Sequence, residues 1–259
     1  MNHPVAAANI SAVVFDLGGT LIEYAGPFKV WPELETPGLE AAYRFLKSKH
    51  VSLPPFSDFR DSAFAHLPGR WQAATEGKRN LRLVDFLSEL LQACGVTGVS
   101  KEWIAEAAQL YQENICVHAQ MIEGARDVLI DLREQGYKIA LLSNTMFEGS
   151  IHQADLQRFN LDPYFDAMLF SADLGMWKPN AAPYLFLLEK LGAAPENAVF
   201  VGDSPEHDVV GGRNAGMHTI YFRSSDRFAE PDGVQPDATI HSLDELPRVL
   251  SGWNAGTNK

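Results

Sequence analysis

The chain has 259 residues and is 46% hydrophobic, which is enough for one large domain or two smaller domains with a full apolar core. Its formal net charge of -12 argues against a surface for nucleic acid or for an anionic membrane. Two isolated cysteines, Cys94 and Cys116, lack C-x-x-C spacing and therefore indicate buried thiols in a reducing compartment.

The N-terminal segment, Met1 to Asn9, has neither the basic residues nor the apolar stretch of a secretory leader. No apolar run in the chain is long enough to span a membrane. We therefore expect a cytoplasmic protein with no nucleic-acid or membrane partner. The sequence leaves open whether it is a monomer or a homodimer.

Short apolar runs that alternate with amphipathic stretches predict βαβ units around a parallel sheet. The first run is residues 12–15, and the pattern resumes near Gly124 and continues to Leu250. Helices are predicted over residues 125–135 and 181–191, each followed by a glycine that is typical of a helix end. The other predicted strands are residues 138–142, 167–170, 198–201, 219–222 and 238–240.

The stretch between residues 23 and 120 has no such strand pattern. Residues 39–49, 81–94 and 103–115 show helical apolar spacing, while Pro54, Pro55, Pro68 and Gly69 are expected to interrupt the helices. We therefore expect an α/β fold in two parts. Residues 1–22 and 121–259 would form a Rossmann-like parallel-sheet core, and residues 23–120 an inserted all-helical domain.

The first strand delivers a carboxylate into a glycine turn. Asp16 follows Val13, Val14 and Phe15, so it is expected at the carboxyl edge of the sheet, where open α/β sheets bind ligands. Glycines at positions 18 and 19 then allow the backbone to approach a ligand closely.

A second apolar strand also ends in an acid. Asp203 follows residues 198–202, and Asp208 comes five residues later, after a turn that can bring it back toward Asp203. If this strand lies beside the Asp16 strand, three carboxylates meet, and their repulsion requires a cation. Oxygen ligands without histidine or cysteine favour Mg²⁺.

Two further predicted strand ends carry the groups that hold a phosphoryl group. Ser143 and Asn144 place a hydroxyl and an amide at the sheet edge, and Lys178, before Pro179, places one cation in a turn. Each residue alone is also compatible with a helix cap or a solvated surface charge. Their order along the chain favours a phosphate site.

These segments resemble the haloacid dehalogenase superfamily, whose four motifs occur in the same order. Residues 15–21 are similar to its first motif, Ser143 and Asn144 to its second, Lys178 and Pro179 to its third, and Gly202, Asp203 and Asp208 to its fourth. The helical insertion resembles the family's C1 cap, which closes over the substrate. The resemblance implies a Rossmann-like core, Mg²⁺ and an aspartate nucleophile that acts on a small phosphorylated metabolite.

Carried over to this sequence, the resemblance implies that Asp16 attacks phosphorus and becomes an aspartyl phosphate. Ser143 and Lys178 would bind the transferring oxygens. The remaining substrate contacts would come from Gly19, Thr20 and Asn144. The implied Mg²⁺ ligands are Asp16, the carbonyl of Gly18, Asp203 and Asp208, the last directly or through water.

Gly18 departs from the family pattern, because phosphatases of the family carry a second aspartate there as the general acid and base. A substitute could come from the cap or from Glu23, Glu206 or His207, or an activated substrate would need none. A second hypothesis is a catalytically silent protein that binds a phosphorylated ligand or a protein partner.

A 2-haloacid dehalogenase or a phosphonatase would also lack the second aspartate. Asp203 disfavours the dehalogenase, which needs no metal and generally lacks this carboxylate. A phosphonatase would need a lysine from the insertion, and the candidates are Lys29, Lys47, Lys49, Lys78 and Lys101.

Specificity is less defined by the sequence. Residues 66–71 and 76–79 combine chain breaks, cations and an aromatic residue, which fits either a substrate-facing loop or a junction between helices. Phe28, Trp31 and Phe147 are candidates for the entrance of the site.

Overall fold

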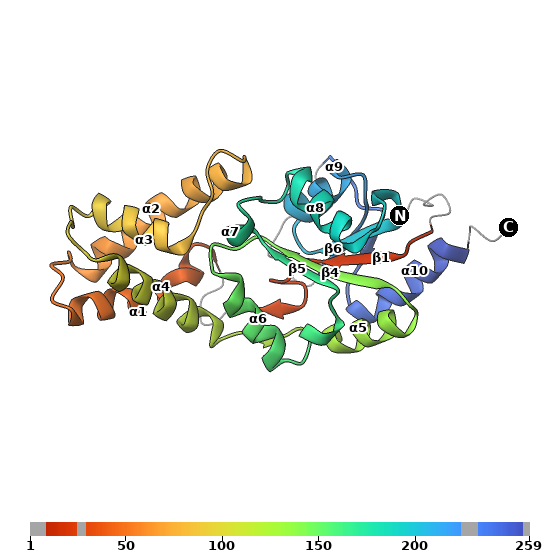
Figure 1. Cartoon of the computed structure of the whole chain (residues 1–259), viewed down its shortest axis with the longest axis horizontal. Coiled ribbons are helices and arrows are strands. Elements are labelled where there is room, and N and C mark those ends of the chain that lie inside the picture. The colour runs from red at the N-terminus through yellow and green to blue at the C-terminus, as the bar shows by residue number, and fades with distance from the viewer. Residues whose placement is uncertain (1–8, 25–29, 224–232, 256–259) are drawn as a thin grey trace.

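The computed structural model describes residues 9–24, 30–223 and 233–255, so the N-terminal segment considered above lies largely outside the described residues. Its centre is a six-stranded sheet in the order β5-β4-β1-β6-β7-β8, and every neighbouring pair is parallel (Figure 1). This confirms the predicted α/β fold. The strands are β1 (Ala12–Phe15), β4 (Lys138–Ser143), β5 (Ala167–Phe170), β6 (Ala198–Gly202), β7 (His218–Phe222) and β8 (Ala238–Ile240).

The predicted strands match closely. β4 and β6 extend one residue beyond the predicted ends, to Ser143 and Gly202, and β7 begins one residue early, at His218. The central strand β1 is fully buried because helices cover both faces of the sheet, and its four residues are accordingly all apolar.

Two helical layers cover the sheet. On one face, α5 (Ala125–Glu134), α6 (Gly149–Arg158) and α10 (Leu246–Ala255) pack Leu129, Leu156 and Leu250 against it. On the other face, α8 (Ala181–Leu191) packs Tyr184 and Leu187, and α9 (Gly211–Asn214) follows on the same side. Figure 1 shows the two layers on opposite sides of the strands. The short helix α7 (Ser171–Leu174) follows β5.

The predicted helical insertion forms a body with its own core at one end of the sheet, at the left of Figure 1. Tyr111 packs there so closely on α1 that a Cβ at Gly38 would lie 2.3 Å from its ring. The chain passes between sheet and insertion at β2 (Ile22–Glu23) and β3 (Gln120–Met121), which pair antiparallel. The insertion's helices are α1 (Thr36–Ser48), α2 (Phe56–Thr75), α3 (Leu83–Ala93) and α4 (Lys101–Cys116).

One expectation for the insertion was wrong. Pro68 and Gly69 do not break a helix but lie inside α2, which continues to Thr75. A proline costs an interior helix one hydrogen bond and about 3 kcal/mol. The buried side chains of Phe59, Ala63 and Leu67 hold α2 against the rest of the insertion, and this packing overrides the local preference.

None of the helices in the described ranges is long and apolar enough to cross a membrane.

Candidate active site

The strand order places three of the predicted site residues side by side. β1 lies between β4 and β6, and all three strands run in the same direction. Their carboxyl ends therefore present Asp16, Ser143 and Asp203 at the same edge of the sheet. All three side chains are buried.

Asp16, Asp203 and Asp208 form a compact cluster, in which one oxygen from each lies within 4.8 Å of the others. A π-helical turn, Pro205–Val210, carries Asp208 back to the sheet edge, where its Oδ2 accepts a hydrogen bond from the Ser204 amide at 2.8 Å. The side chain occupies the space next to Gly202, since a Cβ there would lie 2.2 Å from Asp208 Oδ2. Position 202 is therefore restricted to glycine by the fold of this turn.

Lys178 joins two of these carboxylates. Its Nζ lies 2.6 Å from Asp16 Oδ1 and 2.7 Å from Asp208 Oδ1, and its side chain is only 2% exposed. Burial alone would lower the pKa of Lys178, but the two carboxylates outweigh it and raise that pKa. Burial raises the pKa of Asp16, and Lys178 opposes this rise. The lysine is therefore charged and fixed in place beside Asp16.

The charges at this edge fit a divalent cation. Three carboxylates and one ammonium leave a formal charge of -2 in a buried space. The side-chain donors of the cluster are all oxygens, which suits a hard ion such as Mg²⁺ better than zinc. The residues present thus fit the predicted metal.

The two glycines of the first turn differ in their surroundings. Gly19 has a φ of +86°, and a Cβ there would lie 2.3 Å from Asp203 Oδ2. Its lack of a side chain therefore makes room for Asp203. Gly18 has an ordinary φ, and a Cβ would meet only Tyr24 Cδ2, at 3.8 Å, among the described residues.

The other predicted contacts have different roles. Ser143 faces the cavity beside Asp16, and its hydroxyl has no hydrogen-bond partner within the described part of the chain. Asn144 binds the backbone of Lys178 twice, through Nδ2 to its carbonyl and Oδ1 from its amide, both at 2.9 Å. Thr20 is fully buried and does not line the cavity.

A known protein family matches most of this chain. The family model of the haloacid dehalogenase-like hydrolases matches residues 10–216. The chain belongs to this family. All the active-site residues described above lie inside the matched segment.

Two curated relatives and one solved structure illustrate the similarity. Pyrimidine 5'-nucleotidase YjjG of Escherichia coli (strain K12) is 34% identical over 50% of this chain and 56% of its own length. A glyceraldehyde 3-phosphate phosphatase of Pyrococcus furiosus is 27% identical over 58% of this chain and 61% of its own length. These alignments thus span little more than half of each relative. A 2-haloacid dehalogenase from Pseudomonas syringae pv. Tomato DC3000 superposes with a TM-score of 0.70 at 23% identity, covering 94% of this chain and 99% of that one, and so shares the fold.

In this haloacid dehalogenase-like hydrolase, Asp16 lies in a cavity of about 680 Å³, which we call the Asp16 cavity. Ser143, Lys178, Asp203 and Asp208 line it on the sheet side. Trp31, Trp71 and Ile115 line it from the insertion. The cavity is therefore shared between the sheet and the helical insertion.

Two of the three predicted proton-shuttle candidates reach this cavity. Glu23 and His207 line it, whereas Glu206 is exposed and does not. Burial lowers the pKa of His207 to about 4, and Lys178 acts in the same direction, so this imidazole is neutral at pH 7. A neutral imidazole can accept a proton but is a poor donor.

Only some of the residues predicted to lie at the entrance of the site are found at the cavity. Trp31 and Phe147 line the Asp16 cavity, whereas Phe28 and Lys29 lie outside the described residues. Residues 66–71 belong to α2, and of these Trp71 lines the cavity. Sequence reasoning missed Tyr24, whose only signal was its place just after the first motif. The insertion lysines Lys47, Lys49, Lys78 and Lys101 do not line the cavity.

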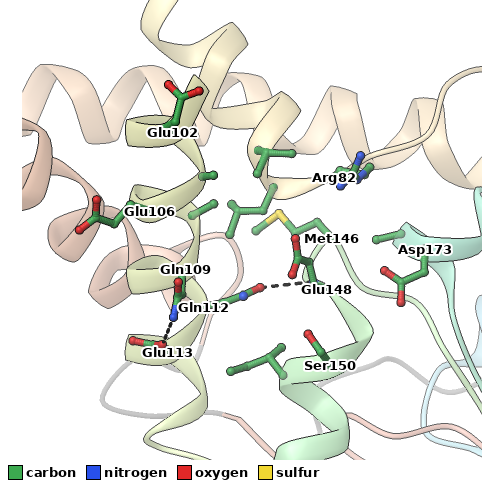
Figure 2. Close-up of a pocket in the computed structure, with 16 residues that line it drawn as sticks. Arg82, Glu102, Glu106, Gln109, Gln112, Glu113, Met146, Glu148, Ser150 and Asp173 are labelled. Carbon is green, nitrogen blue, oxygen red and sulfur yellow. Dashed lines mark hydrogen bonds between the residues drawn. The ribbon is translucent and has the colours of Figure 1, made fainter. Parts of the chain in front are cut away.

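A second cavity, of about 600 Å³, opens between α4 and the segment from Met146 to α6 (Figure 2). Its charged lining is mainly acidic, with Glu102, Glu106, Glu148 and Asp173 against Arg82. Among the described residues, its lining has no counterpart to the buried lysine that pairs with Asp16 and Asp208 in the Asp16 cavity.

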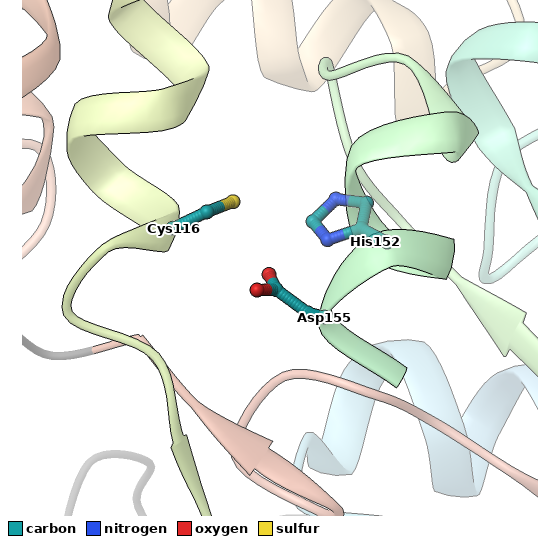
Figure 3. A group of neighbouring side chains, drawn as sticks. All are labelled: Cys116, His152 and Asp155. Carbon is teal, nitrogen blue, oxygen red and sulfur yellow. The ribbon is translucent and has the colours of Figure 1, made fainter. Parts of the chain in front are cut away.

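Cys116, His152 and Asp155 form another group of side chains that bind metals in other proteins, between α4 and α6 (Figure 3). Both ring nitrogens of His152 are already engaged, Nδ1 with the Tyr24 hydroxyl at 3.1 Å and Nε2 with Thr145 Oγ1 at 2.9 Å. Burial lowers the pKa of His152 to about 4 and raises the pKa of the Cys116 thiol. His152 and Cys116 are therefore uncharged at pH 7. The Asp155 carboxyl pairs with the Arg158 guanidinium at 3.0 Å.

These contacts tie both connections of the insertion to the sheet domain. Tyr24 follows β2, and Cys116 ends α4 just before β3. Arg158 of α6 adds hydrogen bonds to the carbonyls of Cys116, at 3.3 Å, and Ala119, at 3.2 Å. As expected from the sequence, Cys94 and Cys116 are free thiols, and Cys116 is buried; Cys94, also expected to be buried, is only half-buried.

Proposed function

We propose that this chain is a Mg²⁺-dependent phosphatase that acts on a small phosphorylated metabolite through an aspartyl phosphate on Asp16. The observation that supports it most is the contact between Lys178 Nζ and Asp16 Oδ1 on the wall of the Asp16 cavity. A buried, charge-paired aspartate that still faces a cavity is suited to be a nucleophile.

In the first step, a carboxylate oxygen of Asp16 attacks phosphorus and the bond from phosphorus to the ester oxygen breaks. Lys178 and the free hydroxyl of Ser143 bind non-bridging oxygens of the phosphoryl group. Asn144 holds the Lys178 peptide through its paired hydrogen bonds, so the ammonium is positioned before substrate arrives.

The metal would be held by Asp16, the Gly18 carbonyl and Asp203. Asp208 already binds Lys178 and the Ser204 amide, so it would act on the metal through water or at one oxygen only. When bound, Mg²⁺ supplies positive charge that offsets the phosphoryl oxygens and the carboxylates.

In the second step, water attacks the phosphorus of the aspartyl phosphate and releases inorganic phosphate and free Asp16. This water must lose a proton, and the leaving alkoxide of the first step must gain one. Gly18 has no side chain that could take the first proton or give the second. Glu23 and His207 line the same cavity, and they are our candidates to take the water's proton and, once protonated, to pass it to the leaving alkoxide of the next turnover.

The comparisons support a phosphatase at a coarse level. Two relatives are named as a 5'-nucleotidase and a glyceraldehyde 3-phosphate phosphatase. The buried carboxylate of Asp203, poised against Gly19, favours a metal-dependent phosphoryl transfer over a dehalogenase. We also propose that residues 23–120 are the cap and that residues 1–22 and 121–259 are the core.

The silent-binder alternative rests on Gly18, and one experiment separates it from the phosphatase. The protein is incubated with Mg²⁺ and an activated aryl phosphate, whose good leaving group needs no general acid. We expect turnover that Asp16→Asn abolishes. Absence of turnover by both proteins, with phosphate binding retained, would establish the silent binder instead.

A further inference from the structure

The Asp16 cavity has an aromatic wall opposite its carboxylates. Trp31 and Trp71 line it from the insertion, and Tyr24 and Phe147 line it from the segments next to the sheet. Trp31 and Trp71 are half-buried, with ring centroids 6.0 Å apart. Trp31 and Trp71 are the largest aromatic side chains that line the cavity.

The position of this wall is fixed relative to the phosphate site. The Trp71 ring packs edge-on against Trp177, with centroids 5.1 Å apart and an interplanar angle of 81°. Trp177 is 1% exposed, and its Nε1 donates to Asn80 Oδ1 at 2.8 Å. Because Trp177 immediately precedes Lys178, the ring contacts from Trp31 through Trp71 to Trp177 link the cavity wall to the lysine beside Asp16.

The charges of the cavity restrict the rest of the substrate. Lys178 is the only lysine or arginine that lines it among the residues the structure describes, and it is already paired with Asp16 and Asp208. Glu23 and Glu35 line the cavity beyond the carboxylate cluster. A second phosphate or a carboxylate on the substrate would therefore find acids there and no cation.

We propose that the substrate is a phosphate monoester whose organic part carries an uncharged, planar aromatic group, and that this group stacks on Trp31 and Trp71. This inference rests on the proposed function and names its substrate class. A cavity of about 680 Å³ accommodates such a ring together with its phosphate and a linking group. The restriction to a single phosphate follows from the single cation, and the aromatic ring follows from the indole side chains on the cavity wall.

The test compares uridine 5'-monophosphate with ribose 5-phosphate, which both carry the scissile phosphate on the primary 5-hydroxyl of a ribose. They differ at C1 of the sugar, which carries the uracil ring in the first and a hydroxyl in the second. Stacking of a base on an aromatic side chain changes affinity by about 5- to 150-fold. We expect kcat/KM for uridine 5'-monophosphate to exceed that for ribose 5-phosphate by at least about tenfold.

Trp31→Ala removes one of the two indoles that line the cavity and leaves Trp177 and Lys178 unchanged. We expect it to lower kcat/KM for uridine 5'-monophosphate by about 5-fold or more. The value of kcat/KM for ribose 5-phosphate should change by less than about twofold. Trp31→Phe should restore most of the loss. The matched control is Trp103→Ala, which removes a half-buried indole of the insertion that does not line the Asp16 cavity. It should leave kcat/KM for both substrates unchanged.

Equal kcat/KM values for the two substrates, or an equal loss on both in Trp31→Ala, would overturn the aromatic subsite while the phosphatase stands. If no phosphate ester is hydrolysed, the proposed function fails instead. Calorimetric binding of the same two compounds to the wild type and to Trp31→Ala then decides the subsite by itself. Tighter binding of uridine 5'-monophosphate that Trp31→Ala removes supports it, and equal binding overturns it.

Discussion

Tyr24 lies beside the side-chain position that Gly18 leaves empty: a Cβ at residue 18 would be 3.8 Å from Tyr24 Cδ2, an ordinary van der Waals contact. Among the described residues nothing else comes within 4 Å of that position, and the φ of Gly18 is not in the left-handed region. Packing therefore does not require a glycine here, in contrast to Gly19, whose place is limited by Asp203. The absence of a carboxylate at position 18 therefore changes the chemistry of the site and is not imposed by the backbone or by packing.

Gly18→Asp should therefore fold and supply the missing proton donor. General acid-base catalysis contributes a factor of about 10² to 10⁴, so we expect kcat on an alkyl phosphate monoester to rise by about tenfold or more. Steady-state kinetics with Mg²⁺ measure this. Gly18→Asn is the control, because it has the same size without a titratable proton and should give no gain. If Gly18→Asp binds Mg²⁺ normally yet is no faster, position 18 belongs to a rearranged mechanism.

Lys178→Met should destabilise the fold. Removing one partner of a buried ion pair costs about 3 to 5 kcal/mol, because Asp16 and Asp208 would be left buried without their cation. Urea denaturation at pH 7 measures the loss, and the difference from wild type should shrink at lower pH as Asp16, whose pKa is raised by burial, takes up a proton. Lys47→Met, at an exposed lysine of α1, is the control and should change stability by less than about 0.5 kcal/mol. A Lys178→Met protein as stable as wild type at pH 7 would show that the ion pair contributes nothing net.

Much of the sheet edge could be predicted from sequence because buried parallel strands are continuous apolar runs. Each run ended at a polar residue, so Asp16, Ser143 and Asp203 could be expected at one edge before the strand order was known. Their contact depends on β1 lying between β4 and β6, and the apolar pattern alone does not specify that order.

The insertion was harder to predict because its helices are positioned by tertiary packing. Pro68 suggested a chain break, yet α2 continues past it and thereby places Trp71 on the cavity. Trp71 becomes part of the wall through its contact with Trp177, 106 positions along the chain, which no local pattern reveals. The sequence around Asp208 likewise did not indicate that its two carboxylate oxygens would accept hydrogen bonds from Lys178 and from the Ser204 amide.

Acid should destabilise the protein through His152. Burial lowers the pKa of this imidazole to about 4 from the usual 6.5, so the unfolded chain binds a proton that the folded chain does not. The free energy of unfolding should fall as the pH drops from 6.5 toward 4, by up to about 3 kcal/mol for this residue. His207 has the same low pKa and adds a similar loss.

His152→Gln isolates the contribution. We expect its stability, measured by urea denaturation between pH 7 and 4.5, to fall less steeply than that of wild type, because the variant lacks the His152 imidazole whose pKa folding lowers. His66→Gln, at an exposed histidine of α2, should leave the slope as in wild type. An unchanged slope in His152→Gln would mean that His152 takes up its proton in the folded state.

Asp203→Asn should separate a metal ligand from a structural acid, because the two roles predict opposite signs. Without metal, the carboxylate cluster has a formal charge of -2, so neutralising Asp203 relieves repulsion and should leave the apo protein as stable as wild type or more so. With Mg²⁺ at 100 times its Kd, wild type should gain about 2.7 kcal/mol, and the variant should lose most of that gain. Thermal unfolding with a chelator measures the stability of the metal-free protein, and thermal unfolding with Mg²⁺ measures the stability that the metal adds. The control is Asp131→Asn, at an exposed acid of α5, which should behave as wild type in both. An Asp203→Asn protein that is unstable without metal yet keeps the full Mg²⁺ gain would assign Asp203 to the fold and leave the ion to Asp16 and Asp208.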